Sequence, residues 1–166
     1  MRGVETDRQA AIDVVVAYAN ALDARDWAGF RALFEERVAI DYASIGSIEQ
    51  MIAADDWVDR CRVLGAFDAT QHKVSNFVVA LDGDRASVTA YVDAAHFVTD
   101  GNRVLEGYAR GTYLHQLRRG PGGGWRIAAC RFTVAGYPGG KAAFDAAFVA
   151  ARAAFAAQNP AKGARA

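Results

Sequence analysis

The chain has 166 residues, of which 52% are hydrophobic and 23% charged, and 19 basic residues balance 19 acidic ones. This length suits one domain, and the composition is that of a folded protein rather than a disordered one. The zero net charge disfavours nucleic acid or an anionic membrane as a partner. The charged start MRGVETDRQ and the lack of a long apolar run predict neither a signal peptide nor a membrane span. We therefore expect a cytoplasmic protein.

The first part of the chain is predicted to form two helices. Thr6 and Gln9 have the spacing of a capping box, and apolar residues recur from there at helical intervals until Asp23. Asp26 is expected to cap the second helix. The inner face of that helix would carry Trp27, Phe30, Leu33 and Phe34.

A short strand and a third helix are expected next. Residues 38–42 alternate between apolar and polar, which predicts a half-buried strand with Tyr42 pointing inward. Residues 55–65 have the pattern of a helix that ends at a glycine. Cys61 and Cys130 lack the spacing of a zinc site or a disulfide framework, so both are expected to be buried thiols.

The second half of the chain changes to a period of two residues, which predicts an antiparallel meander. Helices followed by such a sheet define an α+β fold. A single domain is expected over 1–157, with a flexible tail at 158–166. The predicted strands are 71–81, 85–98, 108–119 and 125–136, and a last amphipathic helix follows at 141–157.

Two histidines are predicted to share one face of this sheet. If residues 82–84 form the loop between the first two long strands, His72 faces Ala94. His96 lies two residues beyond Ala94, so the imidazoles are diagonal neighbours with Cα atoms about 7–8 Å apart. The same face carries Ala90 and Val92, and both histidines would enter a roomy apolar interior where they can share a ligand.

An acid and a phenol belong to the same hypothesis. Asp23 ends a buried helical stripe, and a buried carboxylate needs a donor such as imidazole. An Asp–His pair fixes one tautomer and raises the basicity of the far nitrogen, as a general base near neutral pH requires. Tyr42 would add a hydroxyl that polarises a carbonyl or holds water.

Purely structural roles for these residues compete with the catalytic hypothesis. An inward histidine is often a core residue, Asp23 can cap amides at a helix end, and Tyr42 can simply pack in the core. His115 has no acidic partner in the pattern and is expected to be structural. Two histidines and a carboxylate also make the ligand set of a non-haem iron site, but the tight spacing of such sites is missing. The glycine-rich loop at 120–124 precedes no helix, so no nucleotide site is predicted.

Seven segments, in order, carry a resemblance to a known family: ALDARDWAGFRALF, AIDYAS, TQHKVSNFVV, DAAHFV, YLHQLRR, GGWRIAACRF and FDAAF. They resemble scytalone dehydratase and its bacterial SnoaL-like relatives in the nuclear-transport-factor-2-like superfamily. The resemblance implies a cone-shaped α+β fold, in which a strongly bent sheet is wrapped by helices and closed by the C-terminal helix. It also implies a lyase without metal or organic cofactor, and a homo-oligomer, with a trimer favoured over a dimer.

The resemblance assigns catalytic roles by motif to Asp23, Tyr42, His72 and His96. A second tyrosine of the family is replaced by Leu22, and a serine and an asparagine of the family fall on Gly111 and Tyr113. The acid–base set is thus retained while the substrate-binding set is changed, so we expect related chemistry on a different molecule. The residues expected to bind substrate are Tyr18, Leu22, Tyr113, Cys130, Phe132, Phe144 and Phe148.

The sequence therefore predicts a lyase that acts on a small aromatic or polyketide-like substrate. His96, oriented by Asp23, would be the general base or acid, His72 would handle the leaving group, and Tyr42 would steady the oxygen on which charge builds. The leaving group would be water, or a small aldehyde released by retro-aldol cleavage. An isomerase or cyclase of the same superfamily, or a non-catalytic ligand-binding module, is the alternative.

Overall fold

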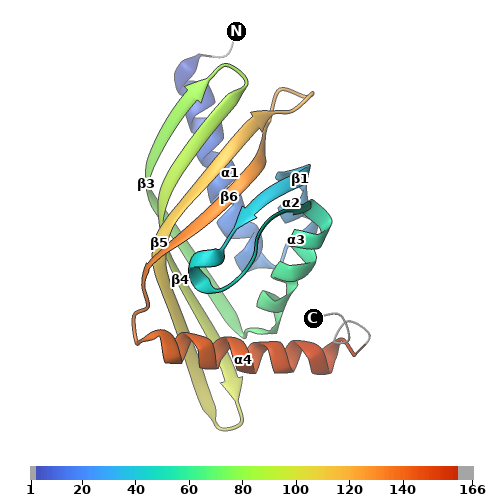
Figure 1. The fold of residues 1–166 in the computed structure, drawn as a ribbon, viewed down its shortest axis with the longest axis vertical. Helices are drawn as coiled ribbons and strands as arrows, with labels where there is room; N and C mark the ends of the chain where they lie inside the picture. The colour runs from blue at the N-terminus through green and yellow to red at the C-terminus, as the bar shows by residue number, and fades with distance from the viewer. Residues whose placement is uncertain (1–2, 161–166) are drawn as a thin grey trace.

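The computed structural model describes residues 3–160, and its body is one six-stranded sheet in the order β2-β1-β6-β5-β4-β3 (Figure 1). Neighbouring strands run antiparallel except β1 and β6, which are parallel. The α+β class is confirmed. The strands are β1 (Phe34–Asp41), β2 (Glu49–Ala53), β3 (Ala69–Asp82), β4 (Arg85–Asp100), β5 (Arg103–Arg119) and β6 (Trp125–Gly136).

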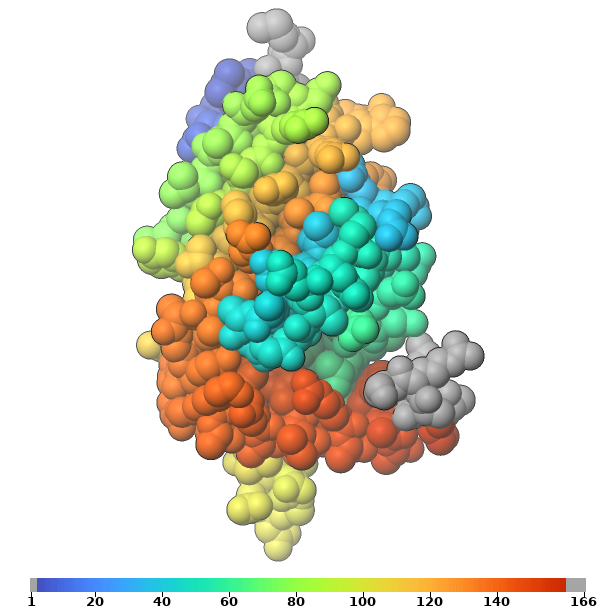
Figure 2. Space-filling view, in the orientation of Figure 1, coloured from blue at the N-terminus to red at the C-terminus, as the bar shows by residue number. Residues whose placement is uncertain are grey.

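The helices lie along the long strands, beside β1 and across one end of the sheet (Figure 1). The long helix α1 packs on β3, and α4 crosses the sheet and packs on β5. The tip of the β4–β5 hairpin projects past α4 (Figure 2). The helices are α1 (Val4–Ala24), α2 (Trp27–Ala32), α3 (Ala54–Cys61) and α4 (Lys141–Gln158), with two 3₁₀ segments, η1 (Ala43–Ile45) and η2 (Arg62–Ala66).

The beginning of α1 differs from the prediction. The helix starts at Val4 after Gly3, no side chain caps it, and Thr6 lies inside the helix rather than at its N-cap. The prediction of a capping box at Thr6 and Gln9 is therefore wrong. The predicted cap of α2 is confirmed, because Oδ1 of Asp26 accepts from the backbone N–H of Gly29 at 2.9 Å.

The end of α2 and the presence of β2 also differ from the prediction. The helix α2 ends at Ala32, and Phe34, expected on its inner face, instead begins β1. The short edge strand β2 was not predicted, because four of its five residues are at least partly exposed and give no alternation. The predicted tail 158–166 begins at the last residue of α4, and from residue 161 it lies outside the described residues.

His72 lies opposite Ala94 as predicted, but the register is reached differently. The turn is one residue tighter than expected, since Asp82 pairs with Arg85. A bulge at Asn76, whose φ is +55°, restores the register. Without this extra residue, a slip of one position would turn His72 to the opposite face of the sheet.

The core lies between α1 and the inner face of the sheet. The inward residues of β4 include Val88, Ala90 and Val92, while Tyr91 on the opposite face is exposed. Cys61 and Cys130 are buried free thiols, as predicted. None of the helices within residues 3–160 is long and apolar enough to cross a membrane.

Candidate active site

Three donors from β3 converge on the side chain of Asp23, near the end of α1. Nδ1 of His72 lies 2.7 Å from Oδ1 of Asp23, and the backbone N–H of His72 donates to Oδ2 at 2.7 Å. The hydroxyl of Thr70 donates to Oδ1 at 2.9 Å. Asp23 thus binds both the ring and the backbone of His72, which fixes the ring relative to the end of α1.

These hydrogen bonds keep Asp23 ionised. Burial alone would raise the pKa of the Asp23 carboxyl, but the bonds from the ring and backbone of His72 and from Thr70 outweigh it and lower the pKa. Because a carboxylate only accepts, Nδ1 of neutral His72 carries the ring proton and Nε2 is left bare. An imidazole held in this way is suited to take a proton at Nε2, since the Asp23 charge stabilises the resulting imidazolium.

His96 is a second neutral imidazole beside the first. Its Nδ1 lies 3.0 Å from the carbonyl oxygen of Gly107, so Nδ1 is the donor and Nε2 is bare. The residue is 4% exposed, and burial, followed by the neighbouring His72, lowers the pKa of His96 to about 4. The centroids of the two imidazoles are 5.4 Å apart, and neither Nε2 atom has a hydrogen-bond partner within residues 3–160.

The predicted pairing of Asp23 with His96 is therefore wrong, because Asp23 pairs with His72. The two histidines do share one sheet face, as the alternation predicted. Which of them meets Asp23 depends on where the end of α1 lies against the sheet. That position is set by packing between segments that are distant in sequence. The hydrogen bond from the backbone N–H of His72 holds the side chain of Asp23 against β3, the edge strand of the sheet.

Aromatic rings enclose His96. Its ring centroid lies 5.3 Å from Phe67, 5.9 Å from Phe144 and 4.9 Å from Phe148. Phe144 and Phe148 come from α4, and Phe67 follows η2. The α4 helix approaches β5 closely at Gly107, because a Cβ there would lie 3.1 Å from the Cβ of Ala147. The surroundings of His96 are apolar, which suits an uncharged substrate.

The predicted catalytic residue Tyr42 lies in a separate buried cluster. Its hydroxyl is 2.7 Å from that of Tyr18 and 3.7 Å from Sγ of Cys130, and among the described residues no hydrogen bond joins it to either His72 or His96. Burial, followed by the nearby Cys130, raises the pKa of Tyr42 well above 10.0, so its hydroxyl stays protonated. Tyr42 is thus a neutral hydrogen-bonding group.

Tyr113 belongs to the Tyr42 cluster. Its ring centroid is 6.5 Å from that of Tyr42. Burial is the main cause of its raised pKa, and the charge of Asp23 also contributes. The other substrate-binding predictions divide between the clusters, with Phe144 and Phe148 beside His96. Around Tyr42 lie Tyr18, Cys130 and Phe132, while Leu22 is buried one residue before Asp23.

Four residues of this site were missed: Arg25, Phe67, Thr70 and Gly107. The period of two places Thr70 on the same face as His72, so alternation could have indicated it. Phe67 and Gly107 contact His96 through long-range packing, and Nη1 of Arg25 donates to the hydroxyl of Thr70, 45 positions away. No local pattern indicates these contacts.

His115 lies in the Tyr42 cluster, not beside the other histidines. Its Nε2 is 3.3 Å from Sγ of Cys130, and burial lowers its pKa to about 3. Its structural role remains a prediction. Within residues 3–160 no three His, Cys, Asp or Glu side chains are grouped so that they could hold a metal ion.

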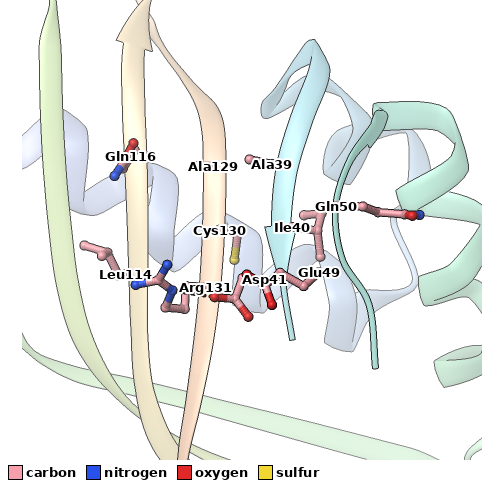
Figure 3. A pocket seen from close by; sticks show the side chains of 10 residues that line it. All are labelled: Ala39, Ile40, Asp41, Glu49, Gln50, Leu114, Gln116, Ala129, Cys130 and Arg131. Atoms are coloured by element: carbon pink, nitrogen blue, oxygen red, sulfur yellow. Dashed lines mark hydrogen bonds and ion pairs between the residues drawn. The ribbon is translucent and has the colours of Figure 1, made fainter. Parts of the chain in front are cut away.

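A hollow of about 380 Å³ lies elsewhere, between β1, β2, β5 and β6 (Figure 3). Arg131 donates to Asp41 across it at 2.6 Å. A second hollow of about 270 Å³ includes Trp27 and Arg62. Neither hollow is lined by Asp23, His72 or His96. We place the candidate active site at the imidazoles because their bare nitrogens offer proton chemistry, whereas Arg131 and Asp41 neutralise each other.

The amino-acid sequence matches a known protein family. The model of the SnoaL-like domain matches residues 5–131, and the chain belongs to this family. An uncharacterised protein of Mycobacterium tuberculosis, Rv2910c, is 32% identical over 124 residues, which cover 74% of this chain and 81% of that protein. The predicted SnoaL-like membership is confirmed.

Solved structures share the fold. The Kfla4162 protein of Kribbella flavida is 26% identical with a TM-score of 0.78, covering 90% of this chain and 99% of that one. A provisionally assigned aromatic ring hydroxylase of Novosphingobium aromaticivorans is 26% identical with a TM-score of 0.72, covering 81% and 92%. A provisionally assigned scytalone dehydratase of the same bacterium is 20% identical with a TM-score of 0.69, covering 78% and 85%. The cone-shaped nuclear-transport-factor-2-like fold is thereby confirmed.

Proposed function

We propose that this protein is a lyase that needs no cofactor and acts on a small, uncharged, aromatic or polyketide-like substrate. The observation that carries the proposal is the Asp23–His72 pair, whose bare Nε2 lies on the same sheet face as that of His96. The phenylalanines around His96 favour an apolar ring as ligand. The scytalone dehydratase and ring hydroxylase names of two structural neighbours are consistent with such a ligand.

His72 is the base of the proposed reaction. Its Nε2 takes a proton from the carbon next to the substrate carbonyl, and the ionised Asp23 stabilises the imidazolium. The electron pair of the broken C–H bond forms a C=C bond as the bond to the β-oxygen breaks. His72 then returns its proton to the departing oxygen, which leaves as water. A positioned proton transfer of this kind contributes on the order of 10²–10⁴-fold to the rate.

His96 and Tyr42 bind the substrate in this scheme. Because His96 stays neutral with Nε2 bare, it accepts a hydrogen bond from the substrate hydroxyl rather than acting as an acid. His72 thus takes both proton-transfer roles, whereas the sequence suggested His96 as the general base or acid and His72 for the leaving group only. The protonated hydroxyl of Tyr42, bound to Tyr18, would donate to the carbonyl oxygen as negative charge develops there.

A screen of aromatic and polyketide-like hydroxy ketones, followed by mass spectrometry, tests the proposal. Loss of water indicates a dehydratase, and loss of a small aldehyde indicates retro-aldol cleavage by the same base. A product of unchanged mass would instead make the protein an isomerase or cyclase. Turnover that survives both His72→Ala and His96→Ala would refute the catalytic assignment and favour a binding module.

The predicted homo-oligomer is part of this proposal. Light scattering on the purified protein measures its mass directly, and a trimer is expected, with a dimer the other common assembly suggested by the resemblance. A monomeric mass would contradict the prediction without bearing on the chemistry of His72.

A further inference from the structure

The carboxylate of Asp23 is supported by a hydrogen-bonded chain that extends beyond His72. Thr70 donates its hydroxyl proton to Oδ1 of Asp23 at 2.9 Å, and the same hydroxyl oxygen accepts from Nη1 of Arg25 at 2.7 Å. Thr70 is 9% exposed, so water competes little for these bonds. The order of groups is thus Arg25, Thr70, Asp23, His72.

Arg25 determines the direction of the Thr70 hydroxyl. A hydroxyl has one proton and two lone pairs, and an arginine can only donate. When Nη1 of Arg25 occupies a lone pair of Thr70, the proton of Thr70 is free to point at Asp23. A carboxylate that accepts several hydrogen bonds is fixed in orientation, and so is the imidazole that it binds.

The backbone conformation of Arg25 at the end of α1 is unusual for an arginine, and its side chain binds the end of the helix. Arg25 follows the last residue of α1 with a φ of +59°, a left-handed conformation that favours glycine or asparagine. Its Nη1 also donates to the backbone carbonyls of Leu22 at 2.8 Å and Asp23 at 3.1 Å. The guanidinium therefore satisfies the end of the helix and reaches β3 with the same nitrogen.

We propose that Thr70 and Arg25 are positioning residues of the Asp23–His72 pair, with Arg25 acting partly through Thr70. Their contribution to turnover rests on the lyase function proposed above. Their effect on Asp23 does not rest on that function, because it can be measured without a substrate.

NMR titration of the Asp23 carboxyl carbon tests the proposal, with the Asp23→Asn variant used to assign the signal. In Thr70→Val, which has nearly the same shape but no hydroxyl, the titration midpoint of Asp23 is expected to move to higher pH. In Thr70→Ser, which keeps the hydroxyl, the midpoint should stay near that of the wild type. An unchanged midpoint in Thr70→Val would overturn the proposal.

A second variant keeps the test decisive if Thr70→Val folds poorly. Arg25→Gly retains the left-handed backbone and removes the guanidinium, so it should fold and also move the Asp23 midpoint upward. Arg25→Gly combined with Thr70→Val should move the midpoint by less than the sum of the two single shifts, because Arg25 acts on Asp23 partly through Thr70 and partly through its own charge. Additive shifts would overturn this order of action.

A measurement of turnover tests the part of the proposal that depends on the lyase function. On a substrate found by the screen, Thr70→Val is expected to lower kcat by about 10–100-fold, as is typical when a partner of a functional group is removed, with KM nearly unchanged. If the wild type turns over nothing, the lyase proposal fails while the titration still decides the positioning role. A wild-type kcat in Thr70→Val would overturn that role in catalysis.

Discussion

Asp23 binds His72 at two points, through the imidazole Nδ1 and through the backbone N–H, each at 2.7 Å. The backbone bond locks the end of α1 onto β3, and the ring bond fixes the tautomer of the imidazole. One carboxylate thereby links the packing of a helix to the chemistry of a base. Changes at Asp23 should therefore affect both stability and activity.

The first prediction concerns the charge of Asp23. Asp23→Asn keeps the shape but removes the charge that stabilises imidazolium at His72, so kcat on the substrate found by the screen should fall by about 10²–10⁴-fold. Stability should fall by about 1–3 kcal/mol in chemical denaturation, because the new amide cannot accept all three bonds. Asp13→Asn on the exposed face of α1 is the control and should change neither quantity. Equal kcat values for the two variants would contradict the prediction.

The second prediction concerns acid stability. Burial lowers the pKa of His96 to about 4 in the folded protein, against 6.5 for a free imidazole, so the unfolded chain binds the proton first as the pH falls. The contribution of His96 is fully present above pH 6.5 and is lost between pH 6.5 and about 4, on the order of 3 kcal/mol. Chemical denaturation at several pH values measures this loss.

His96→Asn serves as the comparison for this pH dependence. Asparagine can still donate to the carbonyl of Gly107 but does not titrate, so the free energy of unfolding should fall less steeply between pH 6.5 and 4. His115 keeps its own contribution in this range, because burial lowers its pKa to about 3, so some loss remains. A slope as steep as that of the wild type would show that His96 is not the group responsible.

Alternation was sufficient to place His72 and His96 on one face, because a period of two residues determines the side of a strand. It could not select the partner of Asp23. That choice depends on the docking of α1 against β3, which brings together residues 49 positions apart. The predicted register was correct only because a tight turn and a bulge at Asn76 compensate, and neither is encoded by hydrophobic alternation.

For the Tyr42 cluster, too, the sequence predicted the residues but not their contacts. The alternation of residues 38–42 predicted the inward side of Tyr42, although β1 ends at Asp41, and Tyr18 is buried on the inner side of α1. The contact between their hydroxyls depends on how α1 packs against the end of β1, and no local sequence pattern specifies that packing. The sequence therefore predicted the candidate residues of the site better than the contacts among them.

The third prediction concerns the two tyrosine hydroxyls. Tyr42→Phe leaves the buried hydroxyl of Tyr18 without its 2.7 Å partner, which should cost about 1–3 kcal/mol of stability. Tyr18→Phe should cost a similar amount. The double variant should cost much less than the sum, because no hydroxyl of the pair is then left unpaired. Additive losses in chemical denaturation would show that the two hydroxyls do not interact.

The fourth prediction concerns the close approach of α4. In Gly107→Ala the new methyl group would lie 3.1 Å from Cβ of Ala147 and 3.2 Å from Cα of Phe144, so α4 must shift. Overpacking of this kind costs about 1–3 kcal/mol. The shift should also loosen the contact between Phe144 and His96 and raise KM for an apolar substrate. Gly124→Ala, where no described atom lies within 4 Å, is the matched control. Equal stability of the two variants would contradict the tight packing.

The fifth prediction separates His115 from His72 and His96, the histidines of the proposed reaction. Its Nδ1 is buried without a hydrogen-bond partner, and its only polar contact within residues 3–160 is Cys130. Replacing such a group by an apolar one of similar size is nearly neutral, because an unpaired buried nitrogen already weakens the fold. His115→Leu should therefore change the free energy of unfolding by less than about 1 kcal/mol and leave kcat within a few-fold, whereas His72→Ala should abolish turnover. A large loss of kcat in a stably folded His115→Leu protein would move the proton chemistry to the Tyr42 cluster.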